Sequence, residues 1–276
     1  MSITDSLVNH EPIVRLTVFI AILAGVAIAE QAWPRRERSL PRMRRWTANL
    51  GILLIDTAAL RFLLPLLAVG MAAEAQRRGW GLFNALDLPA AVELVLCILI
   101  LDLVIYGQHW MFHVVGPLWR LHRMHHTDLD FDVSTGIRFH PLEILISMGI
   151  KIGAVALIGA SVPAVIVFEV LLNGVTMFNH ANLRLPPGVD RLARLIVVTP
   201  DMHRVHHSVR RYETDSNFGF NFPWWDRLFR TYRAQPVDGH ERMIIGVRSF
   251  RDPERQGIFG LLWQPFARGT NRQIFK

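Results

Sequence analysis

Cysteine and lysine are almost absent from this sequence of 276 residues. The single cysteine, Cys97, lies inside an apolar run, so the chain can form neither an internal disulfide nor a CxxC zinc or redox site. Lysine occurs only as Lys151 and Lys276. The sequence also lacks a glycine-rich phosphate loop and any run of interleaved aromatic and basic residues. We therefore expect no nucleic-acid partner, and a bound metal must use nitrogen or oxygen ligands.

Charge is scarce as well. Charged residues make up 19% of the chain and hydrophobic residues 51%. This balance is typical of an integral membrane protein, and the apolar residues collect into four runs, at 14–29, 48–73, 88–106 and 142–179. The last run is too long for one span and contains a turn signal at 159–163, so we interpret it as a hairpin of two short passes. The prediction is an all-α membrane bundle with about four spans, or three spans plus a re-entrant hairpin.

Arginines indicate how this bundle is oriented. Six of them crowd into residues 34–46, directly after the first apolar run. The positive-inside rule places such a loop in the cytoplasm. Counting spans from that loop puts the chain after residue 106, and both ends of the hairpin, on the same side. We therefore predict a cytoplasmic cap. A short apolar patch at 258–266 either contacts the membrane interface or packs on this cap.

The histidines form the most regular pattern in the sequence. Ten of its twelve histidines fall into three boxes and two single positions between them, and only His10 and His240 lie outside. The boxes have the spacings HxxxH, HxxHH and HxxHH. On a helix, residues three or four apart share one face, so each box aims its imidazoles at one point. The ten candidate ligands are His109, His113, His122, His125, His126, His140, His180, His203, His206 and His207.

Ten imidazoles exceed what one tetrahedral or octahedral ion accepts, so the count predicts two metal ions. A dry pocket among apolar helices suits oxygen activation for attack on an unactivated C–H bond. Histidine ligands usually donate their second N–H to a carboxylate, amide or carbonyl group. The candidates for that role are Asp102, Asp128, Asn182, Asp201 and Asp226.

The motifs around the boxes resemble a known family. They run GPLWRLHRMHHTD at 116–128, RFHPLE at 138–143, NHAN at 179–182, HRVHH at 203–207, NFG at 217–219 and WDRLF at 225–229. Over about residues 95–233 the chain is similar to the fatty acid hydroxylase and sterol desaturase superfamily. We accordingly divide the chain into membrane helices at 1–94, a catalytic domain at 95–233 and a cytoplasmic or interfacial tail at 234–276.

The resemblance implies a membrane-bound, non-haem di-iron oxygenase that hydroxylates or desaturates a lipid, such as a fatty acyl group, sterol or sphingoid base. It implies two iron ions, with zinc as a substitute that imidazole sites also accept, and O2 as the co-substrate. Electrons are expected from a separate ferredoxin- or cytochrome-type reductase chain. The box histidines carry over as ligands, as does His180, whereas the spacing around His140 varies among family members.

Two other classes of function stay open at this point. A histidine-rich metal transporter predicts ligands near the middle of the membrane instead of at helix ends. A b-type haem electron carrier needs only two to four histidines facing each other across helices. Hydroxylation and desaturation are not separated, because both begin with the same hydrogen abstraction.

Overall fold

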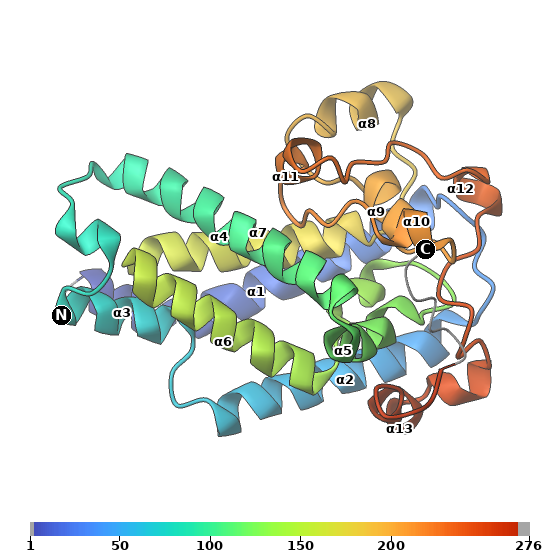
Figure 1. The fold of residues 1–276 in the computed structure, drawn as a ribbon, viewed down its shortest axis with the longest axis horizontal. Helices are drawn as coiled ribbons and strands as arrows, with labels where there is room; N and C mark the ends of the chain where they lie inside the picture. The colour runs from blue at the N-terminus through green and yellow to red at the C-terminus, as the bar shows by residue number, and fades with distance from the viewer. Residues whose placement is uncertain (1–2, 270–276) are drawn as a thin grey trace.

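A computed structural model describes residues 3–269 of the chain, and these residues form helices connected by loops (Figure 1). Within this range no β-strand forms, and the extended pairings are two isolated bridges, Pro34 with Leu183 and Ser208 with Ile245. The predicted all-α class is therefore confirmed. The longer helices are α1 (Ile3–Ala32), α2 (Arg42–Leu63), α3 (Ala68–Arg78), α4 (Ala90–Val114), α6 (Pro141–Ile158) and α7 (Val162–Asn179).

Within residues 3–269, five helical segments are long and apolar enough to cross a membrane, and they begin at Pro12, Arg42, Ala90, Pro141 and Val162. The predicted hairpin is confirmed as α6 and α7, each of 18 residues. Gly159 ends α6 in the left-handed conformation, with φ at 68°. A Cβ on Gly159 would lie 2.7 Å from the Trp80 carbonyl oxygen, so glycine also permits the close approach of the neighbouring loop.

The second apolar run, predicted as a span at 48–73, lies in one candidate span, but it is not one continuous helix. Helix α2 ends at Leu63, and Leu64 adopts an extended conformation before Pro65. Proline excludes the α conformation of the preceding residue and cannot donate to the helix, so the chain breaks here and resumes as α3. Asp56 faces the bundle interior, as a polar residue in a span must if it has no ion-pair partner.

The main apolar core lies between α3, α4, α6 and α7, where Leu101, Val155 and Phe168 are fully enclosed. Helix α1 packs along α7, and α2 packs against α6. Small residues at the start of α3 allow its close approach to the hairpin. The long helices thus pack side by side into a single bundle.

A cap of short helices covers one end of this bundle (Figure 1). The 33–41 loop lies at the same end, because Arg35 donates its N–H to Asn182 O at 3.0 Å. All ten predicted histidines lie at this end, as expected from the sequence. The cap comprises α5 (Gly116–His126), η2 (Val133–Ile137), α8 (Pro187–Ala193), α9 (Pro200–His206), α10 (Arg211–Thr214), α11 (Trp224–Leu228), α12 (Gly239–Arg242), η3 (Pro253–Gln256) and α13 (Ile258–Trp263); a further 3-10 helix, η1 (Leu82–Ala85), follows α3.

Candidate metal centre

A sharp turn brings the first two histidine boxes together. His109 and His113 lie four residues apart near the end of α4, so both rings leave the same face of the helix. The helix ends at Val114. The next residue, Val115, has an extended backbone, and Gly116 and Pro117 begin α5 directly afterwards. Proline fits the first turn of a helix because no N–H partner is needed there. Helix α5 packs against α4, and the second box therefore faces the first.

The third box lies on α9 and the residue that follows it. Helix α9 packs against α7, whose C-terminal cap is His180. The Asn217 side chain supports α9 by donating to Met202 O at 2.9 Å, and Asn217 itself adopts a left-handed conformation with φ at 52°. Asparagine tolerates this conformation better than most residues. The NFG motif thus holds the third box against the end of the hairpin.

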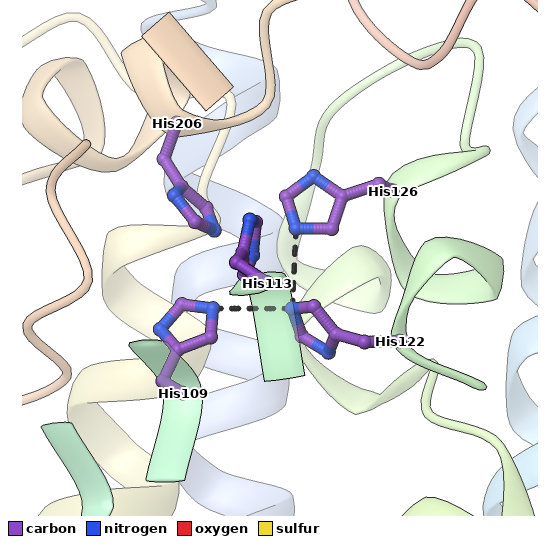
Figure 2. A group of neighbouring side chains, drawn as sticks. All are labelled: His109, His113, His122, His126 and His206. Atoms are coloured by element: carbon purple, nitrogen blue, oxygen red, sulfur yellow. Dashed lines mark hydrogen bonds between the residues drawn. The ribbon is translucent and has the colours of Figure 1, made fainter. Parts of the chain in front are cut away.

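Nine histidines converge into two groups, within each of which one ligand atom per residue lies within 4.8 Å of the others. Figure 2 shows the rings of the larger group, from α4, α5 and α9, pointing toward a common centre. All nine side chains are buried. The larger group contains His109, His113, His122, His126 and His206, and the smaller group contains His125, His180, His203 and His207.

The two HxxHH boxes divide between the groups in opposite ways. In the second box, His122 and His126 enter the larger group and His125 enters the smaller one. In the third box, His203 and His207 enter the smaller group and His206 the larger one. Residues four apart share a helix face, whereas adjacent residues point about 100° apart, and this rule explains both divisions.

The ring nitrogens are arranged as ligands of a cation. His125 Nδ1 and His180 Nδ1 contact carbonyl oxygens, those of Arg138 at 3.1 Å and Thr176 at 2.7 Å, so each must carry its proton on Nδ1. Both Nε2 atoms of these neutral rings then present lone pairs, yet they lie 3.1 Å apart. Two lone pairs at this distance repel each other unless a cation lies between them. Imidazoles bound about 2.0–2.1 Å from one metal ion place their nitrogens roughly 3 Å apart, as here.

The larger group has the same character. His122 Nε2 lies 3.1 Å from His109 Nε2 and 3.2 Å from His126 Nε2, and Figure 2 marks both contacts. His109 Nδ1 donates to the carbonyl oxygen of Phe218 at 2.8 Å, which again leaves a lone pair on its Nε2. The Nε2 atoms of His113 and His206 are buried and have no hydrogen-bond partner among the residues that the structure describes. Buried polar atoms in native proteins nearly always have a partner, and a metal ion supplies one for each.

The histidines of both groups outside the membrane helices are neutral near pH 7. Burial lowers the pKa of His122 to about 3, and burial likewise lowers the pKa of His180 to about 3. The charged imidazolium form is costly in an enclosed site surrounded by other imidazoles. Neutral imidazole is also the form that binds metal ions, so the site is ready for metal without the loss of protons.

Two carboxylates contact the outer nitrogens of the larger group. Glu143 Oε1 accepts from His122 Nδ1 at 2.6 Å, and Asp215 Oδ1 lies 3.4 Å from His113 Nδ1. Neither residue was among the candidates from the sequence. Glu143 did carry a signal, because it is an acidic residue in the first turn of an apolar helix, and such residues in a membrane bundle usually have a specific partner.

The five candidates from the sequence instead hold the backbone that surrounds the site. Asp102 accepts from Trp225 Nε1 at 2.8 Å and so anchors the loop after the NFG motif to α4. Asp226 accepts from the N–H groups of Phe218 and Gly219, and it thereby fixes the Phe218 carbonyl that contacts His109. Asp226 thus positions His109 indirectly, through the Phe218 carbonyl.

The other three candidates pair with arginines of the 33–45 region. Asp128 receives a two-pronged contact from Arg45 at 2.8 Å, Asn182 exchanges hydrogen bonds with the Arg36 backbone, and Asp201 contacts Arg35 at 3.2 Å as well as Arg204. Among the residues that the structure describes, none of the five accepts a hydrogen bond directly from a histidine of either group. The prediction that these five residues accept hydrogen bonds from the ligand histidines is therefore corrected: they hold the backbone around the site.

The structure does not bring His140 to either group. Its Nδ1 accepts the N–H of Leu142 at 3.2 Å and its Nε2 lies 3.2 Å from Leu262 O, so both ring nitrogens are already used. His140 is the N-terminal cap of α6. Of the ten histidines predicted as ligands, nine lie in the two groups. His240, which the sequence analysis set aside, pairs with Gln235 at 2.9 Å, away from both groups.

A protein-family comparison agrees with this geometry. Residues 94–231, half of the chain, match the family model of the fatty acid hydroxylases, a segment that includes all nine grouped histidines. The chain belongs to the fatty acid hydroxylase family. This membership confirms the resemblance seen in the sequence motifs. No solved structure matches the chain.

Three curated relatives illustrate the range of this family. An ornithine lipid hydroxylase of Rhizobium tropici is 29% identical over 67% of the present chain and 54% of its own length. The human alkylglycerol monooxygenase is 32% identical over 53% of the chain and 31% of its own length. The cholesterol 25-hydroxylase of Rattus norvegicus is 24% identical, over 59% and 54%. The matched segments thus span about a third to a half of these relatives.

Proposed function

We propose that this protein is a membrane-bound, non-haem di-iron oxygenase that hydroxylates a lipid with O2 and electrons from another protein. The observation that carries the proposal is the pair of buried histidine groups at one end of an apolar helix bundle, with facing lone pairs that require cations. When two iron ions are bound, they supply the capacity to activate O2 for attack on a C–H bond. Zinc fits the same nitrogen ligands but cannot change its oxidation state.

The residues of the chain perform three tasks in this proposal. Imidazole nitrogens bind the metals, with five ligands for one ion and four for the other. Outer contacts such as Glu143 with His122 keep each proton on Nδ1 and leave Nε2 free to bind. Aromatic rings exclude water: Phe220 lies 4.9 Å from the His109 ring, Phe139 stacks 4.4 Å from His125, and Phe131 covers His180 and His207.

We favour hydroxylation over desaturation, because the three relatives described above are named for hydroxylation or monooxygenation. Hydroxylation consumes one O2, two electrons and two protons for each oxygen atom inserted, and releases one water. Membrane lipids such as ornithine lipids and alkylglycerols, the substrates in two of those names, are the first candidates for assay. The apolar bundle suits a substrate that stays in the bilayer.

We further propose that the histidine groups face the cytoplasm, where a ferredoxin- or cytochrome-type donor is available. Support comes from the arginine-rich 34–46 segment, which lies at the same end as the cap. A reporter fused after Lys276 is expected to read cytoplasmic, and a reporter inserted between Gly79 and Asn84 is expected to read exterior. The reverse pattern contradicts the orientation and excludes a cytoplasmic donor.

The other two classes of function fit the geometry less well. A transporter needs its ligands at the middle of the membrane, whereas these ligands lie at helix ends beneath a cap. A b-type haem carrier needs two rings far enough apart to admit a porphyrin, whereas the Nε2 atoms here approach to 3.1 Å. Both classes therefore rank below the oxygenase.

Comparative lipid analysis tests the proposal directly. Lipids are extracted from the native strain, from a strain lacking the gene, and from deletion strains that express the wild-type chain or His206→Ala. We expect a lipid carrying one additional oxygen atom to disappear on deletion and to return only with the wild-type chain. A hydroxylated lipid that also returns with His206→Ala contradicts metal-dependent oxygenation, and unchanged lipids in all strains contradict the function.

A further inference from the structure

One face of the cap is unusually apolar. Helices α8 and α11 lie together, because Trp224 Nε1 donates to Leu195 O at 2.7 Å and Arg227 donates to Arg194 O at 2.6 Å. Side chains on and beside these two helices are exposed although they are apolar. We call them the α8–α11 shelf; its members are Val189, Leu192, Leu195, Ile196, Trp224, Leu228 and Phe229. A cluster of this kind on a polar cap usually marks a contact surface.

The shelf lies beside α4 and not beyond its end. Trp225 contacts Asp102 at 2.8 Å, and Phe229 stacks on Tyr106 with ring centroids 5.4 Å apart. At 1.5 Å per residue, Asp102 lies about 18 Å and Tyr106 about 24 Å along α4 from Ala90. The hydrocarbon core of a bilayer is about 30 Å thick. Figure 1 agrees, since α11 stands alongside the C-terminal half of α4.

The charges around the shelf have one sign. Within residues 187–196 and 222–231 the exposed charged side chains are Arg191, Arg227 and Arg230. The two acidic residues of these segments are less exposed and have partners: Asp190 pairs with Arg194, and Asp226 is buried. Exposed arginines next to apolar side chains complement anionic lipid headgroups, with the apolar residues entering the acyl region.

Tryptophans are also exposed on other elements near the cap end of the bundle. Trp110 is exposed on α4 one turn after Tyr106, and Trp33 is exposed at the end of α1. On α13, Trp263 and the neighbouring Phe259 are exposed, while Ile258 of the same helix contacts Gly51 of α2. Tryptophan is enriched where membranes meet water. Exposed aromatic side chains thus occur on the shelf and also on α4, after α1 and on α13.

We infer that the α8–α11 shelf is seated in the bilayer, with its apolar side chains among the acyl chains of the leaflet on the cap side and its arginines at the headgroups. The inference depends on the membrane bundle and the shelf contacts, and it does not rest on the proposed enzymatic function. The cap is then a part of the protein that enters the membrane surface instead of standing in water above it.

Fluorescent labelling of the full chain in vesicles tests this inference. Cys97→Ala removes the single cysteine, and Leu192→Cys or Leu228→Cys then carries an environment-sensitive label. Val237→Cys is the matched control, because Val237 is an exposed apolar residue near α12, away from the shelf. The vesicles contain phosphatidylcholine and phosphatidylglycerol. Quenching by nitroxide lipids is compared with quenching by aqueous iodide.

We expect nitroxide lipids to quench the two shelf labels several-fold more strongly than the control label, and iodide to show the reverse order. Shelf labels that respond to iodide as Val237→Cys does overturn the inference. Labels shielded from both quenchers, together with a doubled particle mass, also overturn it, because a second copy then covers the shelf.

Hydroxyl-radical footprinting of the unmodified protein in nanodiscs provides a measurement free of substitutions. Leu192, Leu228 and Phe229 are expected to be oxidised at least several-fold more slowly than Val237 and Ile244, which are exposed elsewhere on the cap. Equal oxidation of both sets contradicts a seated shelf even if a cysteine variant fails to fold.

Discussion

The two histidine groups differ in the number of ligands and in what supports them. The larger group offers five imidazoles, and two of its rings contact carboxylates, His122 with Glu143 and His113 with Asp215. The smaller group offers four imidazoles, and its outer hydrogen bonds go to backbone carbonyls, as His125 does to Arg138 O. A carboxylate raises the basicity of an imidazole ligand more than a neutral carbonyl does.

In the proposed dinuclear centre the two metal sites are therefore not equivalent. An ion in the larger group would have more ligands and carboxylates nearby, whereas an ion in the smaller group would depend on fewer, neutral ligands. We therefore expect the ion of the smaller group to be held less tightly. The oppositely divided HxxHH boxes tie the two groups together, so a change in one box disturbs both.

Removal of a ligand is expected to have the largest effect. His126→Ala in the larger group and His180→Ala in the smaller group each remove a metal bond and should reduce turnover by more than about 100-fold, since even changes in outer partners cost about 10–100-fold. Metal content should fall from two ions to one or fewer, with the greater loss in His180→Ala. Metal analysis with lipid turnover provides the check. His240→Ala is the buried control, and a similar metal loss there contradicts the assignment.

The carboxylates should act on one metal only. Glu143→Gln keeps the shape of the side chain but removes the negative charge beside His122, and we expect about 10–100-fold weaker binding of the ion in the larger group. Asp215→Asn should have a smaller effect, because its contact is longer and Asp215 is partly exposed. Stepwise chelator titration resolves the two ions. Equal weakening of both metals by Glu143→Gln would remove the distinction between the groups.

Acidification should affect both groups. In the metal-free protein burial lowers the pKa of His122 and of His180 to about 3, below the value of about 6.5 expected in an unfolded chain. The unfolded state therefore binds more protons, and stability present above pH 6.5 is lost as the pH falls. The loss between pH 7 and pH 5 is roughly 2 kcal/mol per histidine. Tm of the metal-free protein in detergent measures it, and a constant Tm over this interval contradicts the neutral, buried assignment.

His140→Ala should have the smallest effect. It removes the side-chain cap of α6, which costs about 1 kcal/mol at a typical helix N-terminus. Both metals and most of the turnover should remain, because neither ring nitrogen of His140 points to a metal group. Metal analysis of this variant separates a cap from a ligand. A loss of metal as large as that expected for His126→Ala would show that His140 is a ligand.

Much of this architecture could be predicted from the sequence. Apolar runs identified the membrane helices, because burial in lipid requires nearly continuous apolar side chains, and the turn at Gly159 divided the hairpin. The break at Pro65 was missed, since both flanking segments are equally apolar and hydropathy alone does not register a lost helix bond. A proline inside an apolar run was the available signal.

The histidine boxes identified the ligands but not their division. Spacing shows that His122 and His126 share a face, yet the side from which α9 approaches decides which group each box completes. The partners of the outer nitrogens were harder still to predict, because four of them, Phe218, Arg138, Thr176 and Ser216, contribute backbone carbonyls that any residue could provide. Glu143 comes close to His122 only through the packing of α5 on α6.

Elemental analysis of the purified full chain, with an absorption spectrum of the same sample, tests the central claim most directly. The account predicts two transition-metal ions per folded chain, iron or zinc according to the supply, with no Soret band. A value of one ion or none in a folded, detergent-stable sample, or a haem spectrum, would contradict the claim that the two histidine groups form a dinuclear metal centre.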